Sequence, residues 1–186
     1  GAYITTGITN ENGIRCIARV KCPLLNSNKT VPATNCSGIF EGSTRFGVNF
    51  CPWPNPTQNH LQFMWGNGNA NYGFTQDVLS PSDEFFDLDC EIFSGRQNLS
   101  INGVLKYSKT YSLNSYSLDG SEIWIFQYHN SNWNRYAYNS IASLKLLDAS
   151  GNMLFDGIPC VKNGAPALFD TVGKEFHFNA GSGVLN

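Results

Sequence analysis

Apolar and polar residues alternate with a period of two at several places along the chain. The clearest run is 86–92, where apolar residues at even positions alternate with acids at odd positions. Similar alternation is seen at 15–22, 45–50 and 61–65. Because successive side chains of a β-strand point to opposite faces, each run predicts a strand with one buried and one exposed face. No segment shows the 3.6-residue periodicity that would indicate a helix.

Short apolar segments and turn residues predict the remaining strands. They are expected at 99–101, 104–107, 122–128, 141–147, 153–158, 167–169 and 175–178. Asn102-Gly103 is a strong signal for a tight hairpin, and 149–152 and 171–173 also read as turns. Many short strands joined by Gly, Asn, Pro and Ser turns predict an all-β fold, an antiparallel β-sandwich of the jelly-roll type, with a barrel as the alternative. We expect one domain over residues 1–186.

Four stretches lack a strand pattern and are expected to be long loops: 23–38, 52–60, 66–84 and 129–140. Long loops on a rigid scaffold often carry function, so binding residues are sought there. No linker-like tract and no repeat of fixed period divides the chain.

The composition favours a neutral, hydrogen-bonding surface. Of 186 residues, 41% are apolar and 13% aromatic, but only 14% are charged, with a net charge of −2. The polar surface is therefore carried by Asn, Ser, Thr, Gly and Gln, which suits sugars better than phosphates. Lys and Arg are scattered, so nucleic-acid binding is not expected. No apolar run approaches the length of a membrane-spanning helix, so membrane insertion is not expected either.

Six cysteines form an even but sparse set without a Cys-x-x-Cys pair. We expect at least one disulfide, and the loop between Cys22 and Cys36 is a suitable one to close. The alternative for Cys16, Cys90 and Cys160 is that they are buried small apolar side chains. The start of the chain has no basic segment and no initiating Met, so a mature or excised part of a larger exported protein is expected.

The two ends of the chain carry a family resemblance. The opening Tyr3-Ile4-Thr5-Thr6-Gly7-Ile8, the segment 155–160 with its proline, Ala167-Leu168-Phe169-Asp170-Thr171-Val172 and 176–183 with its Asn-x-Gly-x-Gly all contribute. Together they resemble concanavalin A-like, laminin G-like jelly-roll domains of bacterial and phage surface proteins. Segments 85–103 and 141–148 resemble the intervening strands, and Phe169 stands where Tyr is commoner.

The resemblance implies several functions, because the wider fold includes lectins, carbohydrate-binding modules, adhesive modules and laminarinase-like hydrolases. Those hydrolases carry an acid-x-Asp-x-acid strand that is similar to Asp87, Asp89 and Glu91 here. The first acid is Asp where the family has Glu, and the run also matches an ordinary strand before an Asn-Gly hairpin. These three acids are therefore expected to form a solvated strand face. A glycoside hydrolase is less favoured than a carbohydrate-binding module or an adhesion module.

Aromatic side chains in two loops are the candidate binding residues, because sugar C–H faces stack on aromatic rings while amides and acids bind hydroxyls. The loop 51–60 is stiffened by prolines and carries Trp53 and His60. The second loop, 128–139, supplies the remaining candidates: Trp133, Asn134, Arg135, Tyr136 and Tyr138. Trp65 continues an alternating strand and Trp124 lies between Ile123 and Ile125, so both are expected in the core.

No catalytic residues and no cofactor are expected from these patterns. The resemblance keeps calcium as an alternative, with Asp119, Asp148, Asp156 and Asp170 at turns, although no ligand loop of known spacing is present. The favoured hypothesis is a non-catalytic carbohydrate-binding module, outside the cell or on a cell or virion surface, whose partner is a glycan or surface polysaccharide. The alternative is an adhesion or structural module of a phage tail or bacterial fibre without a small ligand.

Overall fold

The computed structural model describes residues 2–21, 37–42, 46–51, 60–65, 72–74, 84–110, 118–126 and 139–185. At 37, 50, 51, 60–65 and 72–74 it describes the backbone alone. No helix in these described ranges is long and apolar enough to cross a membrane.

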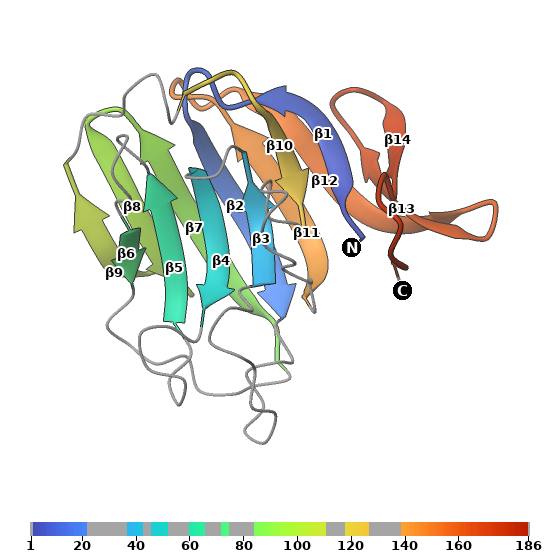
Figure 1. Ribbon diagram of the computed structural model, residues 1–186, viewed down its shortest axis with the longest axis horizontal. Helices are drawn as coiled ribbons and strands as arrows, with labels where there is room; N and C mark the ends of the chain where they lie inside the picture. Colours follow the sequence, from blue (N-terminus) through green and yellow to red (C-terminus); the bar gives the residue numbers. More distant parts are fainter. Residues whose placement is uncertain are drawn as a thin grey trace.

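Two antiparallel sheets pack face to face (Figure 1). The larger sheet has the order β14(Glu175–Phe178), β13(Ala165–Asp170), β12(Met153–Lys162), β11(Ser140–Leu147), β2(Ile14–Lys21), β7(Phe86–Phe93), β8(Arg96–Ile101), β9(Val104–Lys109). The smaller sheet has the order β1(Ile4–Thr9), β10(Glu122–Ile125), β3(Ser37–Glu41), β4(Phe46–Cys51), β5(His60–Trp65), β6(Tyr72–Phe74). The predicted all-β jelly-roll sandwich is confirmed.

The core is formed where the alternating strands face each other. In the centre of the larger sheet, β2 and β7 pair so that Cys16 lies opposite Cys90 and Ala18 opposite Leu88. All four side chains are buried, together with Phe40 and Phe46 from the smaller sheet. Burial raises the pKa of both the Cys16 and the Cys90 thiol, so neither ionises at neutral pH.

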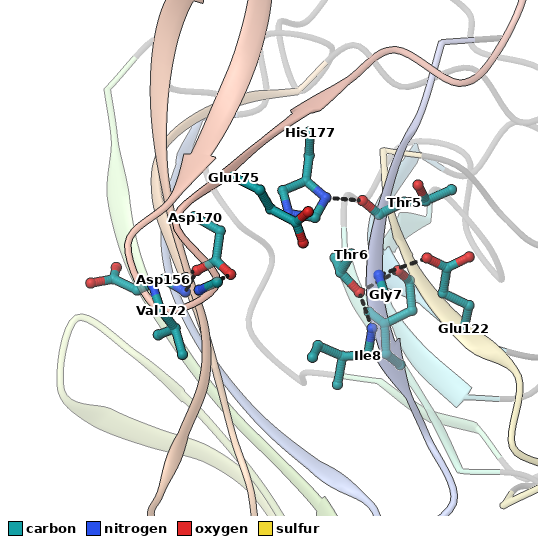
Figure 2. Close-up of polar contacts among 12 residues, drawn as sticks. Thr5, Thr6, Gly7, Ile8, Glu122, Asp156, Asp170, Val172, Glu175 and His177 are labelled. Atoms are coloured by element: carbon teal, nitrogen blue, oxygen red, sulfur yellow. Dashed lines mark hydrogen bonds and ion pairs between the residues drawn. The ribbon is translucent and has the colours of Figure 1, made fainter.

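The predicted turns are present. Asn102 and Gly103 have φ of 49° and 74° and connect β8 to β9, as a two-residue hairpin with two left-handed positions requires. The turn after β13 is fixed by the buried Asp170 carboxylate, which accepts the backbone N–H groups of Asp156, Val172 and Gly173 at 2.8–3.0 Å (Figure 2).

The first and last strands lie side by side and join the two sheets at one edge (Figure 1). Ile4 bridges to Asn179, and the Ala180 N–H donates to the Tyr3 carbonyl at 2.9 Å. His177 Nδ1 lies 2.9 Å from the Thr5 carbonyl, which can only accept, so Nδ1 carries the hydrogen (Figure 2). The proximity of the two ends agrees with the resemblance seen in the sequence.

Some elements differ from the sequence-based prediction. Strands β3 and β6 were not expected, and β6 lies inside a stretch read as a loop. The predicted strand 122–128 ends at Ile125, where a bend follows at Phe126. Cys160 is half-buried rather than buried, and its Sγ lies 3.6 Å from the Ala167 carbonyl oxygen. Cys22 and Cys36 lie outside the described residues; the three cysteines whose side chains are described are free thiols.

Candidate functional site

The binding residues expected from the two loops fall mostly outside the described part of the chain. This applies to Trp53, Trp133, Asn134, Arg135, Tyr136 and Tyr138. His60 is the first residue of β5, where its backbone pairs with Cys51, but its side chain is not described. These assignments stay predictions, and the residues whose side chains the structure describes form a different candidate site.

Trp124 lies on the outer face of the smaller sheet, which corrects the expectation that it belongs to the core. In β10, Ile123 and Ile125 are fully buried in the core, so the residue between them points away from it. Trp124 is half-buried, and the Tyr3 ring stacks on it at a centroid distance of 4.3 Å and an interplanar angle of 17°. The same alternation that located other strands would have placed Trp124 outside.

Glu122 holds the Trp124 ring in place from the same face of β10. Trp124 Nε1 donates to Glu122 Oε2 at 3.3 Å, and the Gly7 N–H donates to Glu122 Oε1 at 2.6 Å (Figure 2 shows the Gly7 contact). Strand β1 therefore anchors the carboxylate, and the carboxylate orients the indole. A carboxylate has about four acceptor positions, so this one keeps capacity for a further donor such as a ligand hydroxyl.

A buried polar pair continues the same face across the sheet. Glu41 lies opposite Trp124 in the β10–β3 register, and Asn49 Nδ2 donates to Glu41 Oε1 at 3.0 Å. Both side chains are fully buried although they point away from the apolar core. Buried charged groups are rare unless they are hydrogen-bonded, so this pair is a built feature of the sheet.

Gly47 makes room for that pair. It lies opposite Glu41 with φ of 144°, and a Cβ there would stand 2.3 Å from the Phe40 carbonyl oxygen and 2.9 Å from Glu41 Cγ. Only glycine allows Glu41 to fold over β4 toward Asn49. We call Tyr3, Glu41, Asn49, Glu122 and Trp124 the Trp124 face. It combines a partly exposed aromatic pair and the partly exposed Glu122 carboxylate with the fully buried Glu41–Asn49 pair.

The outer face of the larger sheet is of a different kind. As the alternation predicts, Asp87, Asp89 and Glu91 share it, and arginines pair with all three. Arg15 binds Asp89 through two bonds of 2.9 and 2.7 Å, Arg19 lies 3.1 Å from Asp87, and Arg96 lies 3.2 Å from Glu91. The hydrogen bond to Asp89 raises the pKa of Arg15. Carboxylates engaged in this way form a solvated, ion-paired strand face.

The aspartates considered for calcium mostly bind their own turns. The Asp148 carboxylate accepts hydrogen bonds from the Asn152 side chain and from the backbone N–H groups of Asn152 and Ser150. These hydrogen bonds lower the pKa of Asp148. Asp119 accepts the Ser121 N–H at 3.0 Å, and Asp156 accepts the Thr171 hydroxyl at 3.0 Å. Within the described residues, no three His, Cys, Asp or Glu side chains are grouped as metal ligands.

Comparisons with known proteins identify the fold. No protein-family model and no curated protein matches the sequence. Among solved structures, a candidate carbohydrate-binding protein from Bacteroides ovatus is similar, with a TM-score of 0.66, 11% identity, and coverage of 97% of this chain and 56% of that one.

Two further structures are similar over most of this chain. A heptameric SAP-like pentraxin from Limulus polyphemus has a TM-score of 0.56, 11% identity, and coverage of 79% of this chain and 70% of its own. Domains LG4-5 of the mouse laminin alpha1 chain have a TM-score of 0.52, 9% identity, and coverage of 82% and 39%. The fold is thus concanavalin A-like and laminin G-like, and the chain spans about half the length of the Bacteroides protein.

Proposed function

We propose that this chain is a non-catalytic module that binds glycan, with the Trp124 face as a binding surface. The observation that carries the proposal is the Tyr3–Trp124 stack, whose indole is fixed by the Glu122 carboxylate. Sugar rings present C–H faces that pack on such aromatics, while a partly exposed carboxylate such as that of Glu122 accepts bonds from their hydroxyls. The similarity in fold to a candidate carbohydrate-binding protein supports the same class of ligand.

One feature of the Trp124 face favours sugar binding. The ring of Trp124 is anchored before any ligand arrives, since Glu122 is itself bonded to the Gly7 N–H. Anchoring of this kind reduces the conformational entropy lost on binding. The predicted loop aromatics Trp53, Trp133, Tyr136 and Tyr138 remain part of the proposal as a second set of contacts. An extracellular or surface location, as part of a longer protein, is proposed with it.

A glycan array followed by affinity electrophoresis tests the proposal. Trp124→Ala is expected to weaken binding of any polysaccharide that the native chain retains by about tenfold or more, because a sugar-stacking aromatic of the kind that dominates binding sites is removed. Phe176→Ala, an exposed aromatic on β14 of the other sheet, is the matched control and should bind as the native chain does.

Trp53→Ala and Trp133→Ala separate the two surfaces. If they abolish binding while Trp124→Ala leaves it unchanged, the glycan site lies on the loops and the Trp124 face is not used. If the native chain binds no polysaccharide, the glycan-binding proposal is wrong, and the adhesion or structural alternative takes its place. Circular dichroism of each variant shows whether it is folded.

A further inference from the structure

The partners of the Glu122 carboxylate on the Trp124 face are electrically neutral. Its two oxygens accept hydrogen bonds from the Gly7 backbone N–H and from Trp124 Nε1 (Figure 2 shows the Gly7 contact). Among the described residues, no Lys or Arg forms an ion pair with Glu122. The side chain is partly exposed, so a ligand can reach it. Glu122 therefore offers a negative charge that no described cation balances.

The rest of the smaller sheet adds no positive charge in the part of the chain that the structure describes. No Lys or Arg occurs in the described stretches that form its strands and adjoining turns, which are 2–11, 37–42, 46–51, 60–65, 72–74 and 118–126. The charged residues in these stretches are all acids: Glu11, Glu41, Asp119 and Glu122. On the larger sheet, by contrast, an arginine pairs with each of the three acids of β7. The Trp124 face therefore attracts cations and repels anions.

The aromatic pair strengthens this preference for positive charge. The face of a Trp ring attracts a cation within about 6 Å of its centroid, and Tyr does so as well. Tyr3 and Trp124 stack beside Glu122, and Trp124 Nε1 lies 3.3 Å from Glu122 Oε2. A sugar that packs on these rings would therefore place its ring substituents next to the carboxylate. Aromatic rings and a carboxylate together are groups that bind ammonium ligands.

We propose that the sugar bound at the Trp124 face carries a free amino group, and that its ammonium donates to the Glu122 carboxylate. The inference rests on the glycan binding proposed above and specifies the class of glycan. A carboxylate has about four acceptor positions, and the Gly7 and Trp124 donors leave room for this further one. A hydroxyl or an N-acetylated amine brings no charge to pair with Glu122, and a uronate, sulfate or phosphate group is repelled.

The hexamer of β-1,4-linked glucosamine and cellohexaose are matched probes, because each glucose ring of cellohexaose carries a hydroxyl in place of the amino group. Isothermal titration calorimetry in mildly acidic buffer, which keeps the amine protonated, measures both affinities. The glucosamine hexamer is expected to bind about tenfold more tightly, because a charge-assisted hydrogen bond and attraction to the rings replace a neutral contact. Salt at about 1 M should reduce this preference and leave the cellohexaose affinity unchanged.

Two variants separate a contact at Glu122 from attraction by the overall charge of the chain. Glu122→Gln removes the carboxylate charge and keeps the size of the side chain, so the two hexamers should then bind about equally. Asp87→Asn removes one negative charge from the outer face of the larger sheet, at a side chain that is 61% exposed, and should keep the preference. Trp124→Ala should weaken the binding of both hexamers.

Hexalysine is the control for the sugar itself, since it carries six amino groups without a sugar ring. Binding of hexalysine as tight as that of the glucosamine hexamer would mean that the face selects charge alone, and the inference would be wrong. The salt titration of the native chain keeps the test valid if Glu122→Gln disturbs the indole. A preference that about 1 M salt does not reduce is not due to the ammonium charge and also overturns the inference.

The remaining outcomes distinguish this inference from the proposed function. Equal affinity for the two hexamers, with both lost in Trp124→Ala, contradicts the amino-sugar inference and leaves glycan binding by the Trp124 face standing. The same holds if the preference is equal in Glu122→Gln and Asp87→Asn, or if the glucosamine hexamer does not bind while another polysaccharide is retained through Trp124. If Trp124→Ala changes the binding of no glycan, the proposed function of this face fails and the inference fails with it.

Discussion

On both outer faces of the sandwich, polar residues alternate with core residues along the strands, but the polar residues of the two faces differ in burial. On the larger sheet, acids at odd positions of β7 pair with arginines that stay about one third to one half exposed. On the smaller sheet, the Trp124 face carries a fully buried Glu41–Asn49 pair beside an aromatic stack. Polar residues on the first face keep a sheet soluble, whereas those on the second require defined partners. The two faces therefore differ in how deeply their polar side chains are buried, and not in whether they carry polar side chains.

Gly47→Ala is expected to have the largest effect on stability, because Gly47 is closely packed against the backbone and side chain of Glu41 in the Trp124 face. The new Cβ would stand 2.3 Å from the Phe40 carbonyl and would force Glu41 out of its position. We expect a loss of about 3 kcal/mol or more in the free energy of unfolding, from backbone strain and overpacking together. Urea denaturation measures it.

Gly95→Ala is the matched control for this substitution. Gly95 also has a positive φ, of 81°, but a Cβ there meets nothing within 4 Å. Its loss should be limited to the left-handed backbone, about 1–2 kcal/mol. Equal losses at the two glycines would show that the close packing around Glu41 does not contribute to stability.

Two Asn–Glu hydrogen bonds, one on each face, give the next comparison. Asn49 donates to Glu41 at 3.0 Å in a fully buried setting, and Asn98 donates to Glu91 at 2.8 Å in a half-buried one. Asn49→Ala should cost about 1–3 kcal/mol, since it leaves a buried carboxylate oxygen without this donor. Asn98→Ala should cost less than about 1 kcal/mol, because water replaces the amide.

Urea unfolding of the two asparagine variants, measured side by side, decides this point. A loss at Asn98 as large as that at Asn49 would mean that the outer face of the larger sheet is not the solvated surface described above.

Sequence patterning predicted the larger sheet better than the smaller one. Strands β2 and β7 alternate between apolar and mostly charged residues, with Ile17 and Phe93 as the exceptions, so a period of two locates them and their buried faces. Strand β3 contains Ile39 and Phe40, which are adjacent and both buried, because the register shifts between Gly38 and Phe40. A bulge of this kind hides the alternation.

The candidate site was harder to predict than the fold for a related reason. Trp124 was assigned to the core because its neighbours are isoleucines, although strict alternation indicates the opposite face. The Glu41–Asn49 bond depends on how β10, β3 and β4 pair, and on the space that Gly47 leaves. Contacts between strands that are distant in sequence are not contained in the local pattern.

A double-mutant cycle on Arg15 and Asp89 tests the solvated face with a smaller expected effect. The pair is bidentate, but its side chains are 36% and 37% exposed, so water and salt screen much of the attraction. We expect a coupling of about 0.5 kcal/mol that falls when the salt concentration is raised to 1 M. A coupling above about 2 kcal/mol that is insensitive to salt would show that the Arg15–Asp89 pair behaves like the buried Glu41–Asn49 pair.

The smallest expected effect concerns Asp148, at the surface turn between β11 and β12. Hydrogen bonds from Asn152 and Ser150 lower the pKa of this carboxyl in the folded chain. A depressed folded pKa contributes stability above the unfolded value of about 3.9, and that contribution is lost as the pH falls through the folded pKa. The difference in unfolding free energy between the native chain and Asp148→Asn should therefore narrow below about pH 4. A difference that stays constant from pH 7 to pH 3 would show that the ionised carboxylate does not stabilise the turn, even though its geometry is that of a cap.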